Sequence, residues 1–332
     1  MKLENAGMPS RRRVLGYFGA TALSLGASQS AQAQKWPDRP VTLIVPFPAG
    51  GNTDTMARLL ADKLQTKYGA PFVVENKPAG GGVVAAGQVA RSAPDGHTLI
   101  FASAGQNIII PMLQKVNYDP EKDLVPVSVF GTGAFILGAK QQAPFSTLQE
   151  MVAYAKANPG RLDVASAGTG SVGHLSAALL AKRAGVQFVA VPYRGGGPAI
   201  AALVAGETDL YFGNASELLQ FADSGRIKLL AVSTPEKLPQ IPNVPTVASV
   251  YPGFSTSAWN GILAPVGLPK NITDALVTGV QEAARDPAIS ARLISLGINP
   301  IGNTPAEFAE IIAKERLSYR EAVDAAGLKM EE

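Results

Sequence analysis

The chain of 332 residues has no cysteine and only two histidines, His97 and His174. Without cysteine it can form no disulfide, no thiolate metal site and no cysteine nucleophile. Two histidines far apart in the sequence do not supply a zinc ligand set, so we expect no metal site. These absences exclude thiol chemistry and argue against a zinc enzyme.

Outside the first 33 residues, which we call the leader, the chain has no excess of positive or negative charge. The net charge is +3, and four of the 29 basic residues and one of the 26 acidic residues lie in this leader. That leaves 25 of each in the remainder, which is therefore neutral. The basic isoelectric point comes from the leader and does not indicate a nucleic-acid-binding surface.

The first 33 residues are typical of a secretory signal peptide. Basic residues up to Arg13 precede an apolar segment, 14–27, which is shorter than the ~20 residues needed to span a bilayer. Ala31-Gln32-Ala33 predicts cleavage near Ala33, and Ser10-Arg11-Arg12-Arg13 leaves Sec and twin-arginine export as alternatives. No later stretch has membrane-spanning length, so we expect a soluble protein located in the periplasm.

One stretch near the new N-terminus organises the rest of the chain. The apolar run Val41–Val45 predicts a strand buried on both faces, and a glycine loop, 46–52, follows it. Helical spacing of apolar residues begins at Thr53, and Asn52, Thr53 or Asp54 can cap this helix. A glycine loop that opens a helix offers free N–H groups and a positive dipole end, which together can hold an anion.

Strands and helices alternate along the remainder, which predicts α/β lobes built on parallel sheets. We expect separate strands at 124–130 and 134–139, divided by Gly131-Thr132-Gly133, where the chain leaves the first lobe. It returns near 251–261. The prediction is therefore a first lobe of residues 34–133 plus 256–332 and a second lobe of residues 134–255. Two hinge crossings join them around a ligand cleft. Thr304 and Glu307 predict the capped start of a long terminal helix.

A second glycine loop, Gly168–Gly173, matches the G-x-G-x-x-G pattern of dinucleotide-binding proteins. That interpretation requires an acidic residue ~20 residues further on, and residues 188–194 contain none. We therefore expect no cofactor and interpret the loop as a second anion-binding site. Its donors would be backbone amides and the hydroxyls of Ser166, Thr169 and Ser171.

Nucleophilic catalysis has little support in the sequence. There is no G-x-S-x-G motif, and His97, after a Pro-Asp-Gly turn, is expected at the surface. Ser171 and His174 could form a nucleophile–base pair, or His174 could simply make local hydrogen bonds at a helix N-terminus. Arg194, which precedes three glycines, could bind a carboxylate as a bidentate fork or remain solvated. Trp259 and Tyr193 are expected as cleft walls or as core.

Seven motifs in order make the mature chain, from Trp36 to about Ala326, resemble the Bug family of extracytoplasmic solute receptors. These are also known as the TctC-type binding proteins of tripartite tricarboxylate transporters. The motifs are Pro46–Gly51 with Asp54 and Arg58, Glu75–Gly81, Pro94–Leu99, Ala167–Ser171 with His174 and Leu175, Val191–Gly196, Gly206–Glu207 with Asp209, and Leu230–Ser233 before Val244–Thr246. Two positions depart from the family pattern: His97 replaces a tyrosine and Ser249 an acidic residue.

The resemblance implies a two-lobed periplasmic binding protein of the type II, Venus-flytrap kind, each lobe a sheet flanked by helices. Such a protein is a monomer without catalytic activity. It binds a small organic carboxylate between the lobes and delivers it to the integral-membrane permease subunits of the transporter. Two alternatives remain: an exported serine hydrolase using Ser171 and His174, or a ligand sensor that signals to a sensor kinase of a two-component system.

The resemblance also implies the binding site. The carboxylate would lie between the loops 49–54 and 166–171, and Ser103 and Asn214 would meet the variable end of the ligand. The expected ligand-binding residues are Phe47, Ala49, Gly50, Gly51, Asn52, Thr53, Asp54, Ser103, Ser166, Thr169, Gly170, Ser171, His174, Arg194 and Asn214.

Overall fold

The computed structural model describes residues 36–193, 195–222 and 224–329. The expected signal peptide and Arg194 lie outside these residues. Contacts divide the chain into two units, Met1–Asp38 and Arg39–Glu332, and all the described helices and strands belong to the second. Within the described residues, no helix is both long enough and apolar enough to cross a membrane.

Strands and helices alternate as the sequence predicts. The strands are β1 (Val41–Val45), β2 (Phe72–Asn76), β3 (Thr98–Ala102), β4 (Leu124–Lys140), β5 (Leu162–Ser166), β6 (Phe188–Pro192), β7 (Leu210–Asn214), β8 (Ile227–Val232), β9 (Ser257–Pro265) and β10 (Ile298–Pro300). The α-helices are α1 (Asn52–Tyr68), α2 (Val83–Ala90), α3 (Ile110–Leu113), α4 (Leu148–Ala157), α5 (Val172–Ala184), α6 (Gly196–Ala205), α7 (Ala215–Ala222), α8 (Lys270–Arg285), α9 (Pro287–Ser295) and α10 (Pro305–Ala325). Short turns of other helix types are η1 (Ala79–Gly82), η2 (Gly105–Ile109) and η3 (Val247–Ser249).

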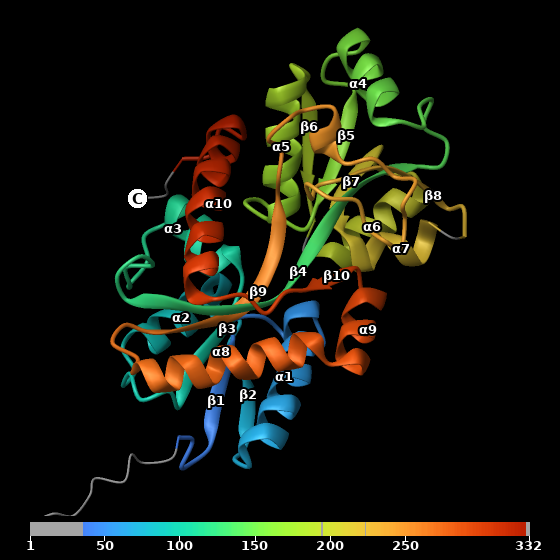
Figure 1. Cartoon of the computed structure of the whole chain (residues 1–332). Helices are drawn as coiled ribbons and strands as arrows, with labels where there is room; N and C mark the ends of the chain where they lie inside the picture. Colours follow the sequence, from blue (N-terminus) through green and yellow to red (C-terminus); the bar gives the residue numbers. More distant parts are fainter. Residues whose placement is uncertain (1–35, 194, 223, 330–332) are drawn as a thin grey trace, which may run out of the picture. The chain divides into compact units, whose positions relative to one another are not determined.

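The strands form one hydrogen-bonded path in the order β2-β1-β3-β9-β4-β7-β5-β6, with β8 and β10 both pairing with β4. We call β1–β3 with α1 and α2 the first half, and β5–β8 with α4–α7 the second half (Figure 1). Within each half, β1 pairs in parallel with β2 and β3, and β5 with β6 and β7. The predicted parallel pairing thus holds within each half, whereas β4 and β9 pair with their neighbours antiparallel, which the sequence analysis did not predict.

β4 is a single strand of 17 residues, so the predicted break at Gly131–Gly133 is also wrong. Its first part pairs with β9, and its second part pairs with β7 and β8. Gly131 does not form a turn, and its lack of a side chain leaves room for neighbouring residues. A Cβ on Gly131 would lie 2.8 Å from Ile298 Cγ2 and 2.9 Å from Met56 Cε. β4 therefore runs through both halves of the molecule (Figure 1).

The core follows the hydrophobic pattern of the sequence. In β1, Val41 and Leu43–Val45 are fully buried, as expected for a strand covered on both faces. In α1, the buried side chains include Met56, Leu60 and Leu64, which recur at helical spacing and form the face that packs on the sheet. These contacts fix the loop between β1 and α1 against a rigid base.

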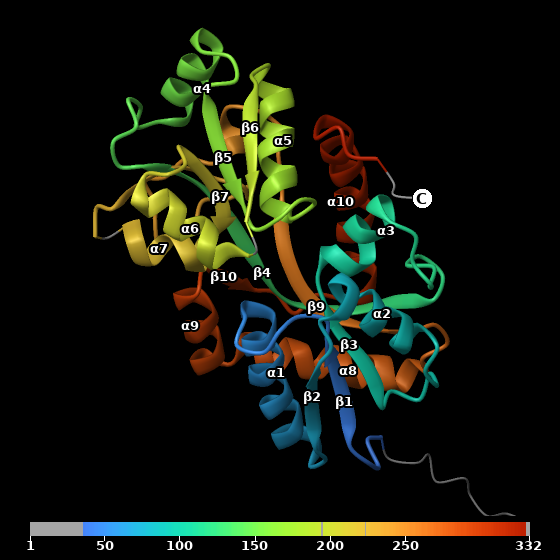
Figure 2. The same cartoon turned by 180° about the vertical axis from the view of Figure 1, so that it is seen from behind.

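α10 is the element that packs along β4 and against the second half. It packs against α5 of the second half and against β4, and it stands beside α5 in both views (Figures 1 and 2). Arg183 of α5 donates to Glu321 of α10 at 2.8 Å. The helix begins at the predicted capping box, in which Thr304 and Glu307 bond reciprocally.

Candidate ligand-binding site

A cavity of about 810 Å³ lies where the two halves face each other. The first half contributes the residues 47–53, with Ser103, Gly105 and Gln106, and the second contributes 167–173, with Tyr211 and Asn214. Among the described residues that line it, none is Asp, Glu, Lys, Arg or His. The described lining can therefore contact an anion through neutral donors and the dipoles of its backbone.

One such set of donors lies at the start of α1. The first bond of the helix runs from Thr55 N to Gly51 O at 2.9 Å, so the N–H groups of Asn52, Thr53 and Asp54 precede it. The N-cap is Gly51, and no side chain caps the helix. The prediction that Asn52, Thr53 or Asp54 would cap it is wrong.

The side chains of Asn52 and Thr53 are held by other elements. Asn52 Nδ2 donates to Ser216 Oγ of α7 at 3.0 Å, and Thr53 Oγ1 donates to Asn260 Oδ1 of β9 at 2.7 Å. The first of these bonds connects the two halves beside the cavity. Both side chains are thus kept away from the N–H groups that the helix presents.

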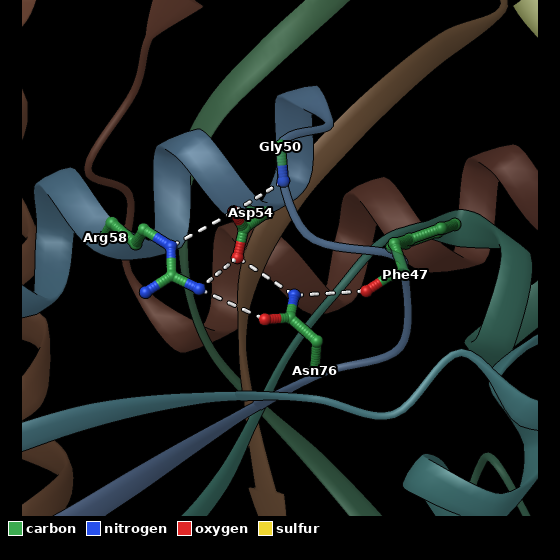
Figure 3. Close-up of polar contacts among 5 residues, drawn as sticks. All are labelled: Phe47, Gly50, Asp54, Arg58 and Asn76. Carbon is green, nitrogen blue, oxygen red and sulfur yellow. Dashed lines mark hydrogen bonds and ion pairs between the residues drawn. The ribbon is translucent and has the colours of Figure 1, made fainter.

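Asp54 does not line the cavity, because its carboxylate turns under the loop (Figure 3). Oδ2 accepts from Gly50 N at 2.8 Å and from Arg58 Nε at 3.0 Å. Oδ1 accepts from Asn76 Nδ2 at 2.9 Å, and Asn76 Nδ2 also donates to Phe47 O at 3.1 Å. This network fixes the loop between Phe47 and Gly50, where Gly50 has a φ of 84° that favours glycine.

The charge state of Asp54 follows from the same contacts. Burial disfavours the ionised form, but hydrogen bonds from Arg58, the Gly50 N–H and Asn76 outweigh it and hold the pKa of Asp54 below its ordinary value. The carboxylate is therefore ionised at neutral pH, and Arg58 pairs with it at 2.9 Å. Paired in this way, Asp54 supports the loop without placing a free negative charge at the cavity.

A second set of donors lies at the start of α5. Ser171 is the N-cap, its Oγ accepts from His174 N at 3.3 Å, and Leu175 N begins the helical ladder by donating to Ser171 O. The N–H groups of Val172 and Gly173 precede this bond, and both residues line the cavity. The cavity thus receives the positive ends of two helices, α1 and α5, one from each half.

Ser166 and His174 lie behind the cavity wall. The Ser166 hydroxyl donates to Gly168 O at 3.4 Å, and His174 Nδ1 accepts from Gly170 N at 3.0 Å. Gly170 has a φ of 74°, so this bond holds a conformation that favours glycine. Burial lowers the pKa of His174, which keeps the imidazole neutral and able to accept this bond.

The Ser171–His174 pair required by a serine hydrolase is not formed. The Ser171 hydroxyl accepts from the backbone of His174, while the imidazole Nδ1 accepts from the backbone of Gly170. A general base must reach the proton of its nucleophile, and neither bond does this.

His97, expected at the surface, is only 6% exposed, and its Nδ1 lies 3.4 Å from Pro40 O.

The structure brings most of the expected ligand-binding residues to one cavity. Those that line it are Phe47, Ala49, Gly50, Gly51, Asn52, Thr53, Ser103, Thr169, Gly170, Ser171 and Asn214. Asp54, Ser166 and His174 do not line it; their side chains bond within the two loops, and their contact with a ligand stays a prediction. Arg194 lies outside the described residues.

Several lining residues were missed from the sequence. Asn260 could have been found, because it is a polar residue within the apolar pattern of β9. Tyr211 lies similarly within the apolar β7, whereas Phe135 of β4 gives no signal that separates it from core. Trp259, considered as a cleft wall, is fully buried and donates from Nε1 to Glu315 at 2.7 Å.

Comparison with known proteins decides the family. The family model TctC, described as "Tripartite tricarboxylate transporter family receptor", matches residues 56–328. The chain belongs to the TctC family. Protein BugT of Bordetella pertussis, a TctC-like relative of this chain, is 34% identical over 320 residues, which are 96% of this chain and 97% of BugT. The resemblance inferred from the seven motifs is thereby confirmed.

Solved structures similar to this TctC chain confirm the α/β fold of two-lobed periplasmic solute-binding proteins. A structure described as "R. palustris Rpa4515 with adipate" has a TM-score of 0.78 and 32% identity, covering 89% of this chain and all of that one. MatC (Rpa3494) from Rhodopseudomonas palustris with bound malate has a TM-score of 0.73 and 35% identity, covering 87% of this chain and all of MatC. The periplasmic binding protein BugD has a TM-score of 0.74, 32% identity and similar coverage, 89% and 100%.

Proposed function

We propose that this protein is an extracytoplasmic receptor that binds a small organic carboxylate in the cavity between its halves. It acts in the periplasm after loss of its signal peptide, performs no chemistry on its ligand, and delivers the ligand to the permease subunits of a tripartite tricarboxylate transporter. The observation that carries the proposal is the meeting of the α1 and α5 N-termini at one cavity, whose described lining residues carry no charge.

In this proposal the ligand carboxylate lies between the loop before α1 and the loop before α5. Helix N-termini favour an anion by typically 0.3–1 kcal/mol each, and up to about 2 kcal/mol where they are partly buried. Neutral donors bind more weakly than an arginine fork would, so the ligand can leave again. The adipate and malate complexes of the related structures support a carboxylate as the ligand class.

Isothermal titration calorimetry with mono-, di- and tricarboxylates tests this function. We expect at least one of them to bind at micromolar or tighter affinity. Gly51→Val and Thr169→Val should each weaken binding by about tenfold or more, the equivalent of about 1.4 kcal/mol. Both sites tolerate a side chain: a Cβ on Gly51 would lie no nearer than 3.7 Å to another residue, and Thr169 is exposed.

Thr66→Val, on the exposed face of α1, is the matched control and should bind like the wild type. Unchanged melting temperatures would show that Gly51→Val and Thr169→Val remain folded. A complete panel without a binder would contradict the proposal, as would wild-type affinity in both variants. Ester turnover by the wild type that is lost in Ser171→Ala would instead establish an enzyme.

Delivery to a permease has a separate test. Membrane vesicles containing the transporter's integral subunits should accumulate the labelled ligand only when the purified receptor is added. The Thr169→Val receptor should support slower uptake at ligand concentrations below its dissociation constant. Uptake that is independent of the receptor would remove delivery from the proposed function while leaving binding intact.

A further inference from the structure

A helical segment that follows β3 of the first half reaches a loop of the second half. η2 and α3 form one continuous stretch, residues 105–113, which we call the η2–α3 segment. Both views show the loop before α5 extending toward it (Figures 1 and 2). The residues of this segment that line the cavity are Gly105, Gln106, Ile109 and Ile110. The segment therefore meets the second half at the cavity itself.

The last residue of the segment lies directly against the loop before α5. Gly170 has a φ of 74°, and a Cβ added to it would lie 2.6 Å from Leu113 Cδ1. Glycine is thus the residue that leaves room for the leucine in this position. Ile109 precedes Leu113 by four residues, so the two side chains share one face of the helical segment. On that face Ile109 lines the cavity, and Leu113 contacts the second half.

Hydrogen bonds hold the η2–α3 segment to the chain that follows it. The Tyr118 hydroxyl donates to Gln106 O at 2.6 Å, and Asn107 Nδ2 donates to Pro120 O at 3.0 Å. Burial raises the pKa of Tyr118, so its hydroxyl stays protonated and able to donate. The segment is fixed in this way on its own side of the cavity. A change in the distance between the halves at this wall is therefore taken up at Leu113.

The Gly170 side of the contact belongs to the loop that presents the α5 N–H groups. Gly170 N donates to His174 Nδ1 at 3.0 Å, and the N–H groups of Val172 and Gly173 follow in the chain. A gap of about 1 Å removes up to half of a van der Waals attraction. Leu113 consequently stabilises the loop only while the two walls of the cavity touch.

We propose that Leu113 is a latch: by packing against Gly170 it holds the two halves together around the bound ligand and slows the release of the ligand. Leu113 does not line the cavity, so it is a positioning residue that acts through the loop before α5. This inference rests on the proposed function, because it concerns the release of the same ligand. It goes further by assigning the residence time of the ligand to one contact.

Surface plasmon resonance on the immobilised protein tests the latch. The probes are the mono-, di- and tricarboxylates of the calorimetric panel, among them benzoate, malate, adipate and citrate. For each probe that binds, Leu113→Ala should raise the dissociation rate constant roughly tenfold and leave the association rate constant nearly unchanged, as for the loss of one well-packed interface side chain. A wild-type dissociation rate constant in Leu113→Ala would overturn the inference.

Two further variants separate the latch from a general effect on folding. Leu113→Met keeps most of the side-chain volume and should restore a dissociation rate constant near that of the wild type. Leu317→Ala removes the same atoms from a leucine of α10 that is 73% exposed, and it should keep both wild-type rate constants. If Leu113→Ala does not fold, Leu113→Val replaces it, with a smaller but measurable rise in the dissociation rate constant.

A double-mutant cycle tests whether Leu113 acts through Gly170. Gly170→Ala displaces Leu113 and also places an alanine at positive φ, so its loss of affinity combines two costs. The cost of the φ is the same in the Leu113→Ala background, whereas the cost of the displacement disappears. We therefore expect the loss to be roughly threefold or more smaller in that background. Equal losses in the two backgrounds would overturn the inference.

Gly160→Ala is the matched control for the backbone cost. Gly160 has a φ of 69°, and a Cβ added to it would have no neighbouring atom within 4 Å. This variant should leave the rate constants unchanged with either residue at position 113. Failure of every probe to bind the wild type would refute the proposed function itself. Probes that bind the wild type and leave Leu113→Ala at the same rate would refute only the latch.

Discussion

Asp54 lies in the first turn of α1, where the sequence predicts it, and its carboxylate contacts its own loop. An aspartate in the first turn after a glycine loop can contact either a ligand or the loop itself, and the sequence does not distinguish the two. The structure gives it Gly50, Arg58 and Asn76 as partners. Asn76 lies in β2, 22 residues from Asp54 in the sequence, so local residue spacing does not predict this contact.

Removing the charge of Asp54 should loosen the loop that it supports. Asparagine cannot accept from Gly50, Arg58 and Asn76 together, because one of its two polar atoms is a donor. We expect Asp54→Asn to lower the free energy of unfolding by about 1.5–3 kcal/mol, the range for hydrogen bonds to charged groups. Ligand affinity should fall as well, since the loop carries part of the site.

The matched control is Asp274→Asn on α8, whose carboxylate pairs with Lys270 at the surface. Exposed pairs contribute about 0–1 kcal/mol, so this variant should behave nearly as wild type. Urea unfolding and calorimetry measure both effects. Equal stability of the two variants would show that the Asp54 network does not hold the loop.

At the scale of elements, local patterns predicted β1 and the starts of α1, α5 and α10 to within a few residues, and the capping box at the start of α10 is confirmed. The errors occur where distant strands decide the outcome. Gly131-Thr132-Gly133 resembles a turn, yet β9 and β10 pair with it from more than a hundred residues later. The antiparallel pairing of β4 likewise depends on β7 and β9, and the alternation of strands and helices along the chain does not indicate which strands pair.

The two glycines of β4 differ in the space around them, which gives a matched pair of substitutions. A Cβ at Gly131 would lie 2.8 Å from Ile298 Cγ2 and 3.2 Å from Asn299 O, whereas at Gly133 the nearest atom is Ala258 O at 3.6 Å. Gly131→Ala should therefore destabilise the protein by about 1–3 kcal/mol through overpacking. Gly133→Ala should have little effect, and equal melting temperatures would contradict this account.

α10 carries a half-buried glutamate, Glu315, against β9. Glu315 accepts from Ser257 Oγ at 2.8 Å and from Trp259 Nε1 at 2.7 Å. Burial raises its pKa to about 7, although these two hydrogen bonds act in the opposite direction. Because the folded-state pKa exceeds the ordinary 4.5, its stabilising contribution is full below about 4.5 and is lost as the pH rises through about 7.

Glu315→Gln removes this titration while keeping the shape of the side chain. We expect the wild type to lose stability relative to the variant between pH 5 and pH 8, as measured by thermal unfolding in steps across that range. Glu310→Gln, exposed on the same helix, should retain the wild-type pH profile. Parallel profiles for the wild type and Glu315→Gln would show that Glu315 does not titrate in this window.

For the whole molecule, the sequence predicted two crossings, near 131–135 and 251–261, and a ligand site between the parts that they join. The loops that reach the cavity were found because glycine before a helix start is a local signal. The bond from Asn52 to Ser216 joins residues 164 positions apart. It has no signature within one stretch of sequence.

We propose that the two predicted lobes, 34–133 with 256–332 and 134–255, move as bodies and close on the ligand. The chain has no cysteine, so spin labels can be attached at Thr66→Cys on α1 and Lys156→Cys on α4 without background. Double electron–electron resonance should report a changed distance between the two labels when ligand is added. Labels at Thr66→Cys and Asp274→Cys, both in the first lobe, should report a constant distance.

The place of β9 in the sheet bears on how the protein is made. In the order β2-β1-β3-β9-β4, residues 257–265 fill the gap between two strands that leave the ribosome more than a hundred residues earlier. Until then, β3 and β4 each expose an unpaired edge, which is a template for association with other chains. We therefore expect the sheet to be completed only after residues 257–265 have been synthesised.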